Sequence, residues 1–168
     1  MSEEVSNTPT RQVLLQRIYL KDASVEVPQA PQVFTRQWNP QLDVQVGTTT
    51  VALGNDIHQV MLTVTVTAKL GEETGFLVEV HQAGIFQVAG FAAESDLQAI
   101  LAGYCPGVVF PFAREAVADL IQRSGFPPVL LQPINFEALY VEHLARARTE
   151  RTGRGCRRHH RSVRGMVP

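Results

Sequence analysis

Carboxylates are the residues of this sequence that could most readily do acid–base chemistry. Glu72 and Glu73 lie in the turn Gly71–Gly75, and Glu79 follows in an alternating stretch. A general acid–base pair needs a cleft that shifts the pKa values of its members. Because water should solvate both acids of a turn, we favour a solvated hairpin over a catalytic pair. Glu79 shares its strand face with Leu77, and an exposed leucine beside a carboxylate favours a protein-docking patch.

The histidines and cysteines form no recognisable catalytic or metal-binding motif. His58, His81 and His143 are isolated in sequence, although the first two fall on neighbouring predicted strands and could meet at a metal ion. The patterns CxxC, HExxH and GxxxxGK are absent. Cys105 lies in an apolar stretch and is predicted to be a buried, inert thiol. "CRRHHR" places Cys156 near two histidines but offers no fourth zinc ligand. We therefore predict a protein that is not an enzyme, with no metal and no cofactor.

The composition is typical of a globular protein with one domain. The chain has 168 residues, of which 45% are hydrophobic and 18% charged. Its N-terminus, "MSEEVSNTPTRQ", is acidic and polar, whereas a signal peptide is basic and then apolar. The apolar runs, such as "VVFPFA", are shorter than a membrane span. We expect a cytoplasmic protein with no membrane insertion.

The charge of the chain is divided between two parts of opposite sign. Residues 1–145 carry a net charge of −8, whereas residues 146–168 carry +7, which is due to eight arginines. Such a tail could bind nucleic acid or an anionic surface by counterion release, and this is the alternative function that we retain. However, no aromatic residue is interleaved to stack on bases, so we regard nucleic acid as an unlikely partner.

Four stretches alternate with the period of a β-strand. They are residues 16–27, the stretch around Leu42, Val44 and Val46, residues 57–70 and residues 76–90. Pro28 and Pro31 exclude regular sheet pairing in the segment that follows the first of these stretches. The glycine-flanked turn 71–75 predicts a hairpin with a five-residue loop. These patterns predict an antiparallel sheet of about four strands.

The pattern becomes helical after Gly90. Glu94–Asp96 offer N-cap chemistry for residues 97–104, and Cys105–Gly107 are expected to end that helix. Residues 110–125 predict an amphipathic helix, and Asn135 is the expected N-cap of a last one. Strands followed by helices indicate an α+β fold, a four-stranded antiparallel sheet with helices packed on one face. We expect residues 1–11 to be disordered, 12–147 to form the folded domain and 148–168 to be a flexible basic tail.

Several long segments of unusual composition follow one another from about residue 16 to residue 144: "QRIYLKDASVEVPQAPQVF", "QWNPQLDVQV", "VTVTAKLGEETGFLVEV", "QAGIFQVAGF", "AGYCPGVVFPFARE" and "GFPPVLLQPINFEALY". In content and order they resemble one family, SecB, the bacterial protein-export chaperone. The resemblance implies the same sheet-and-helix fold and a homotetramer built as a dimer of dimers. It also implies a chaperone that works without ATP. Such a protein binds unfolded preproteins in the cytosol, keeps them competent for translocation and delivers them to the SecA motor.

The resemblance also assigns roles to individual positions. The SecA-docking residues carry over as Asp22, Glu26, Leu77 and Glu79. The residues at or near the client-binding groove carry over as Trp38, Leu42, Val44, Val46, Tyr140 and Leu144. The alternative for these apolar residues is a place in the core, and Trp38 is the one we most expect to be partly accessible. One departure concerns the tail, since family members usually end in a short, often acidic segment.

Overall fold

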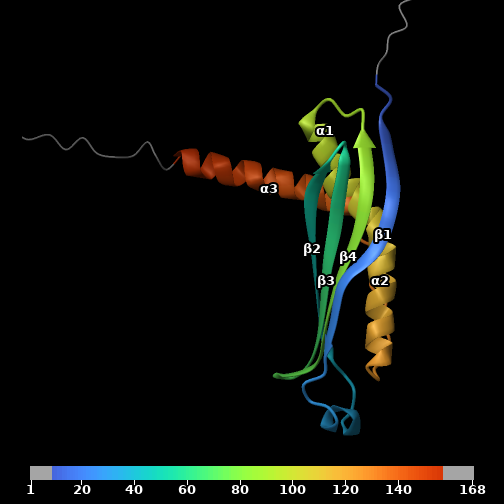
Figure 1. The fold of residues 1–168 in the computed structure, drawn as a ribbon. Coiled ribbons are helices and arrows are strands. Elements are labelled where there is room, and N and C mark those ends of the chain that lie inside the picture. The colour runs from blue at the N-terminus through green and yellow to red at the C-terminus, as the bar shows by residue number, and fades with distance from the viewer. Residues whose placement is uncertain (1–8, 157–168) are drawn as a thin grey trace, which may run out of the picture.

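The computed structural model describes residues 9–156, and side chains from residue 9 to residue 152. Four strands form one antiparallel sheet in the order β1-β4-β3-β2 (Figure 1). Their bounds are β1, Gln12–Glu26; β2, Gln41–Gly54; β3, Ile57–Leu70; and β4, Glu73–Ala89. Strands β2 to β4 follow one another as a meander, and β1 pairs along the free edge of β4. The predicted four-stranded sheet is confirmed, although β1 begins at Gln12, earlier than the expected residue 16.

The β3–β4 hairpin is tighter than the sequence suggested. Leu70 pairs with Glu73, which leaves a turn of only Gly71 and Glu72, so the predicted five-residue loop is wrong. Gly71 has a φ of +64°, a value that glycine adopts without steric cost. The register shifts just after the turn, where β4 passes Gly75. Strands β1 and β2 are joined by a loop with one 3-10 turn, η1, Gln32–Thr35.

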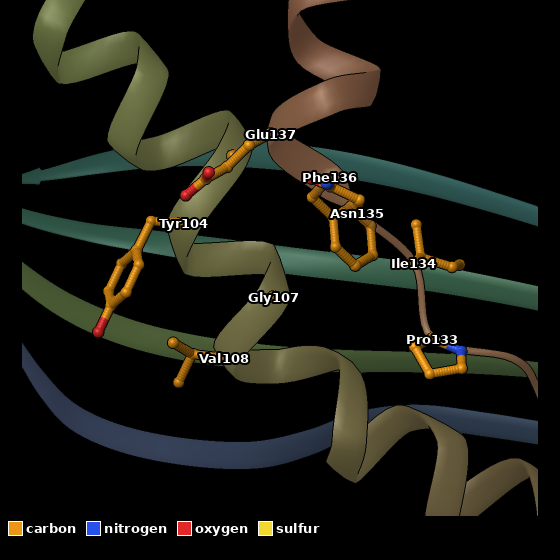
Figure 2. Close-up of a pocket in the computed structure, with 9 residues that line it drawn as sticks. Tyr104, Gly107, Val108, Pro133, Ile134, Asn135, Phe136 and Glu137 are labelled. Carbon is orange, nitrogen blue, oxygen red and sulfur yellow. The ribbon is translucent and has the colours of Figure 1, made fainter.

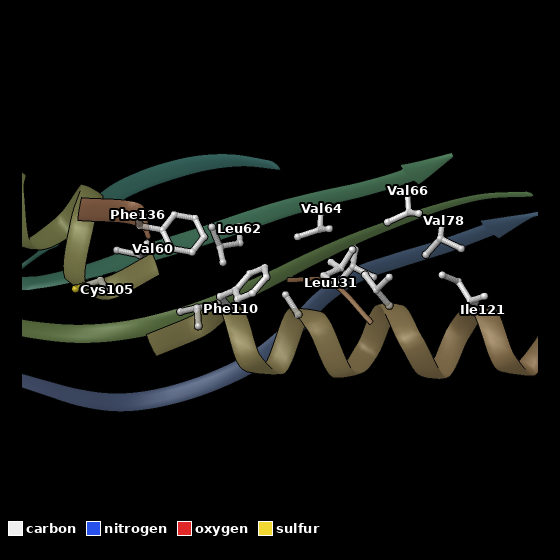
Figure 3. Close-up of a cluster of buried hydrophobic side chains, with 14 of the residues drawn as sticks. Val60, Leu62, Val64, Val66, Val78, Cys105, Phe110, Ile121, Leu131 and Phe136 are labelled. Carbon is white, nitrogen blue, oxygen red and sulfur yellow. The ribbon is translucent and has the colours of Figure 1, made fainter. Parts of the chain in front are cut away.

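The two faces of the sheet have different surroundings. On the covered face, valines of β3 and β4 and Leu62 of β3 face helix α2, Cys105–Arg123 (Figure 3). The phenylalanines of β4 belong to the same core. Val109, Val117 and Ile121 of that helix are fully buried. On the opposite face, which we call the open face, no helix packs within the described residues. The strict alternation along β3 and β4 thus separates an apolar core from a half-exposed polar surface.

One continuous helical run follows the sheet. Helix α1, Glu94–Ala99, continues through a π-helical turn, η2, Ile100–Tyr104, into α2. The prediction that Cys105–Gly107 end a helix is therefore wrong. The wider π turn lets the Cys105 N–H donate to the carbonyl of Ile100, and Pro106, which has no N–H, lies at the start of α2. The expected cap at Glu94–Asp96 is also wrong, because α1 is preceded by Ala93 and has no side-chain cap.

By length and composition alone, the run Glu94–Arg123 could cross a membrane, although our sequence reading found no stretch long enough. A core helix of a globular protein can have the same composition. Here Val109, Ala113 and Val117 are fully buried against the sheet, which accounts for part of the apolar character of the run.

Helix α3, Phe136–Cys156, begins where it was expected. Asn135 caps it, since its Oδ1 accepts a hydrogen bond of 3.0 Å from the backbone N–H of Ala138. The helix packs on η2 through its first turn and then projects from the body (Figure 1). The helix continues past residue 147, the expected end of the folded domain, through alanine, arginine and glutamate residues that favour helices. Residues 1–8 of the expected disordered N-terminus and 157–168 of the expected tail lie outside the described residues.

Candidate functional site

Four residues from two adjacent strands gather on the open face. Leu77 and Glu79 alternate with buried valines along β4, so they point away from the helix. On β1, Glu26 is the cross-strand partner of Leu77, and Asp22 is the partner of His81. Directly paired residues of an antiparallel sheet point to the same face. The structure therefore brings all four predicted docking residues onto one surface.

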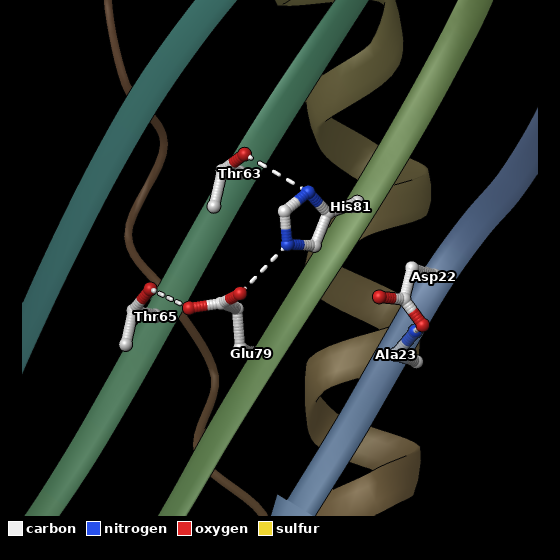
Figure 4. A network of polar contacts seen from close by, with 6 residues as sticks. All are labelled: Asp22, Ala23, Thr63, Thr65, Glu79 and His81. Carbon is white, nitrogen blue, oxygen red and sulfur yellow. Dashed lines mark hydrogen bonds and ion pairs between the residues drawn. The ribbon is translucent and has the colours of Figure 1, made fainter.

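Glu79 is held by a network of side chains (Figure 4). Its Oε1 lies 2.7 Å from Nε2 of His81, and its Oε2 accepts a hydrogen bond of 3.3 Å from the hydroxyl of Thr65. Nδ1 of His81 in turn lies 3.3 Å from the hydroxyl oxygen of Thr63. The hydrogen bond from His81, more than any other contact, lowers the pKa of the Glu79 carboxyl below its ordinary value. Glu79 is thus an ionised, oriented carboxylate on an accessible surface.

The other acids of this face are more exposed. Asp22 accepts a hydrogen bond of 2.9 Å at Oδ1 from the backbone N–H of Ala23. Glu26 is exposed beside Leu77, and Asp43 of β2 lies on the same face across Thr67. Together these acids make a negative surface around one half-buried leucine, which suits a basic protein partner.

Trp38 belongs to an aromatic cluster at one end of the covered face. Its ring centroid lies 4.5 Å from that of Phe126 and 5.9 Å from that of Phe76, and Phe34 lies 5.1 Å from Phe126. A Cβ atom on Gly75 would lie 2.9 Å from the Trp38 ring, so this glycine makes room for the indole. Trp38 remains half-buried and Phe34 is exposed. The cluster is therefore an apolar surface continuous with the core.

The predicted groove residues of β2 lie at the margin of the core. Leu42 and Val44 are 43% and 42% exposed, although their cross-strand partners Ala68 and Val66 are fully buried. The reason is that β2 is the edge strand of the covered face, and α2 packs on β3 and β4. These side chains therefore extend the core as an accessible apolar strip.

Val46 continues this strip to helix α3. Val46 and Tyr140 line one cavity of about 290 Å³, together with Leu139 and Phe136. Leu144, one helical turn beyond Tyr140, does not line that cavity and is exposed. The structure thus joins five of the six predicted client residues along one margin of the covered face, and Leu144 lies further out on α3.

Sequence reasoning missed several residues of these two surfaces. Phe34 and Phe126 complete the aromatic cluster, and His81 and Thr65 hold Glu79. The alternation of β3 and β4 could have placed His81 and Thr65 on the face of Glu79. Nothing in the sequence indicated that Phe126, in a loop, would meet Trp38.

A larger cavity, of about 570 Å³, contains none of the predicted site residues (Figure 2). Tyr104 and Val108 line it from the helical run, and Pro133, Ile134 and Phe136 line it from the segment that leads into α3. Its lining is mostly apolar and includes one carboxylate, Glu137. It offers no group of residues that could act as nucleophile and base.

Two of the alternatives based on metal or thiol chemistry do not fit the structure, whereas the side chains of the segment 156–160 lie outside the described residues. His58 belongs to the covered face of β3, whereas His81 lies on the open face, so the idea that they share a metal ion is wrong. Within residues 9–152, no three histidine, cysteine or acidic side chains are grouped to hold a metal. Burial raises the pKa of the Cys105 thiol to about 12, which keeps it protonated and unreactive.

Comparison with known proteins identifies the family. The family model described as "Preprotein translocase subunit SecB" matches residues 6–147. The chain belongs to the SecB family. A SecB protein-export protein of Nitrosococcus oceani is 47% identical over 150 residues, which cover 84% of this chain and 91% of that protein. The SecB of Chromobacterium violaceum is 51% identical over 145 residues, 86% of this chain and 95% of that protein.

A solved structure of a SecB-like chaperone shares the fold. A SecB-like chaperone of Mycobacterium tuberculosis, in complex with an antitoxin peptide, matches with a TM-score of 0.60 at 20% identity. The match covers 73% of this chain and 90% of that chain. SecB relatives at nearly half identity over most of the chain make it a protein-export chaperone. The resemblance found in the sequence is thereby confirmed.

Proposed function

We propose that this SecB-family protein holds unfolded preproteins along the apolar strip of its covered face and hands them to the SecA motor through its open face. The observation that carries this proposal is the separation of the two surfaces. Exposed apolar groups lie at the β2 margin, and acidic side chains lie on the opposite side of the same sheet. A client and a motor could then be bound at the same time.

The apolar strip suits a client without defined sequence. Burial of apolar surface contributes roughly 25 cal/mol per Å² and is not directional, so many extended segments can gain it. The aromatic cluster around Trp38 and the cavity at Tyr140 offer two deeper points along the strip. A chaperone of this kind binds the unfolded state and disfavours folding by mass action, and no nucleotide is needed for that.

The open face suits a basic partner. Attraction between an acidic patch and a basic segment speeds encounter and fixes orientation. Leu77 supplies an apolar contact in the middle of the acids, and the hydrogen bond from His81 holds Glu79 in one orientation. On this basis SecA docks at Asp22, Glu26, Leu77 and Glu79.

Exposed apolar side chains also support assembly into a homotetramer. β1 is an edge strand that presents Leu14, Leu15 and Leu20 to solvent, and Phe112 is exposed on α2. Unpaired edges and exposed large apolar groups favour association. The proposed place of action is the cytosol, where precursors are made.

One experiment tests the central claim. An unfolded client diluted out of denaturant should aggregate less in the presence of the purified protein, and adding ATP should change nothing. Light scattering would follow the client, and the mass of the chaperone would be checked in the same buffer. A well-folded tetramer that leaves aggregation unchanged would remove the proposal.

A further inference from the structure

Four polar side chains form a chain across the centre of the open face. The hydroxyl of Thr63, the ring of His81, the carboxylate of Glu79 and the hydroxyl of Thr65 follow one another at 3.3, 2.7 and 3.3 Å (Figure 4). His81 is central to this chain, because each of its ring nitrogens meets one neighbour. The docking residues assigned above include Glu79 but not His81, whose hydrogen bond orients that carboxylate.

The geometry accommodates both charge states of the imidazole. In the neutral ring, Nε2–H donates to Glu79 and Nδ1 accepts from the hydroxyl of Thr63. In the protonated ring, both nitrogens donate and the oxygen of Thr63 accepts, since a hydroxyl can play either part. Protonation therefore changes the charge of the His81–Glu79 pair from −1 to zero without requiring Glu79 to move.

The charged groups around His81 are mainly acidic. From β1, Asp22 is its cross-strand partner and Glu26 lies further along the strand, with Lys21 exposed at a register shift. In the other direction along β1, Tyr19 and Arg17 lie on the same face, and the hydroxyl of Tyr19 donates to Gln59. From β2, Asp43 lies on the same face, and Lys69 lies near it at the end of β3. At the level of His81, β3 contributes only threonines, and α2 packs on the other side of the sheet. Asp22 and Glu79 are therefore the acids that lie next to His81 on this face.

We propose that His81 is a positioning residue of the docking face, which orients Glu79 toward a basic partner segment and weakens docking when it is protonated. This inference rests on the proposed docking role of Leu77 and Glu79. Histidine is the side chain whose charge ordinarily changes between about pH 5 and 8. Beside a neutral ring, a cation of the partner meets an uncompensated carboxylate. Beside a protonated ring, it meets a compensated pair and a positive imidazolium, so affinity rises with pH.

The test compares the pH dependence of SecA binding in wild type and His81→Gln. Glutamine can donate to Glu79 and accept from Thr63, but it does not titrate. At constant ionic strength from about pH 5.5 to 8.5, the wild type should gain roughly two- to fivefold more affinity than the variant. Because both chaperones meet the same SecA, the titration of SecA itself cancels in this comparison. His143→Gln, on α3, is the matched control and should keep the wild-type dependence.

The outcomes distinguish a failure of this inference from a failure of the proposed docking function. If Glu79→Lys weakens SecA binding but His81→Gln keeps the full wild-type pH dependence, the role of His81 is overturned and the docking face stands. If Glu79→Lys leaves binding unchanged, the docking face and this inference are both lost.

A measurement on the wild type alone covers the case of a variant that does not fold. Calorimetry in two buffers of different ionisation enthalpy gives the number of protons released on binding. Binding near pH 6 should release more protons than binding near pH 8, since the partner favours the neutral ring. Equal release at the two pH values would contradict the proposal.

Discussion

At the scale of single residues, Glu79 is the group whose environment is best defined. Glu79→Lys places a cation in the acidic docking surface, so we expect SecA affinity to fall roughly five- to thirtyfold, as two weakened surface charge interactions would predict. Glu72→Lys is the matched control, because it makes the same charge change in the hairpin turn. Titration calorimetry checks both variants, and client holding should be unaffected. Equal losses in the two variants would indicate a general charge effect and would count against the assigned patch.

The hydrogen bond from His81 should also be visible in the titration of Glu79. This hydrogen bond lowers the pKa of the Glu79 carboxyl, so the contribution of Glu79 to the stability of the fold is fully present above its ordinary pKa of 4.5. The contribution is lost as the pH falls through the lowered pKa. In His81→Ala the main cause is removed, so the Glu79 carboxyl should titrate at a higher pH. Carboxyl NMR shifts measure this directly, and an identical midpoint in the two proteins would refute it.

Contact with the ring of Trp38 explains why residue 75 is a glycine. A methyl group at this position would press on the ring of Trp38, so Gly75→Ala should cost about 1–3 kcal/mol and shift the emission of this single tryptophan. Gly47→Ala, on β2, is the control, since nothing lies within 4 Å of the added Cβ. Denaturant unfolding followed by fluorescence checks the pair. If Gly47→Ala were as destabilising as Gly75→Ala, the Trp38 contact would not be the cause.

At the scale of elements, β2 combines two surfaces in one strand. Val44 faces the apolar strip and Val51 the open face, and they are 42% and 49% exposed. Val44→Asn should weaken the binding of an unfolded client several-fold, because apolar contact area is lost from the strip. Val51→Asn makes the same chemical change on the other face and should leave client binding intact. Competition for a fluorescent unfolded client measures both, and equal affinities of the two variants would argue against the strip.

At the scale of the whole molecule, charge and assembly decide how the surfaces work together. Each chain combines a body of −8 with a C-terminal part of +7. Removal of residues 148–168 should preserve the tetramer and client holding, whereas any RNA binding should disappear, because it would depend on the arginines. Multi-angle light scattering should give four times the mass of one chain before and after truncation, and the intact chain has a mass of 18.5 kDa. Loss of client holding with the tail would shift the proposed client surface toward α3.

The sequence by itself determined the elements of this protein and, through its resemblance to SecB, the family. Alternation along β3 and β4, the prolines after β1 and the cap at Asn135 are local patterns, and each depends on residues a few positions apart. At Cys105–Gly107, local chemistry allowed a helix either to end or to continue. The predicted helix end was wrong because a π turn accommodated the proline.

The tertiary structure alone decided which side chains meet and which remain accessible. β1 pairs with β4 across a long separation in sequence, and this places Asp22 opposite His81. Alternation places Val44 and Val66 on the same face of the sheet. Only the strand order leaves Val44 exposed and Val66 buried. A sequence period of two determines which face of the sheet a side chain occupies, whereas its burial depends on where the helices pack.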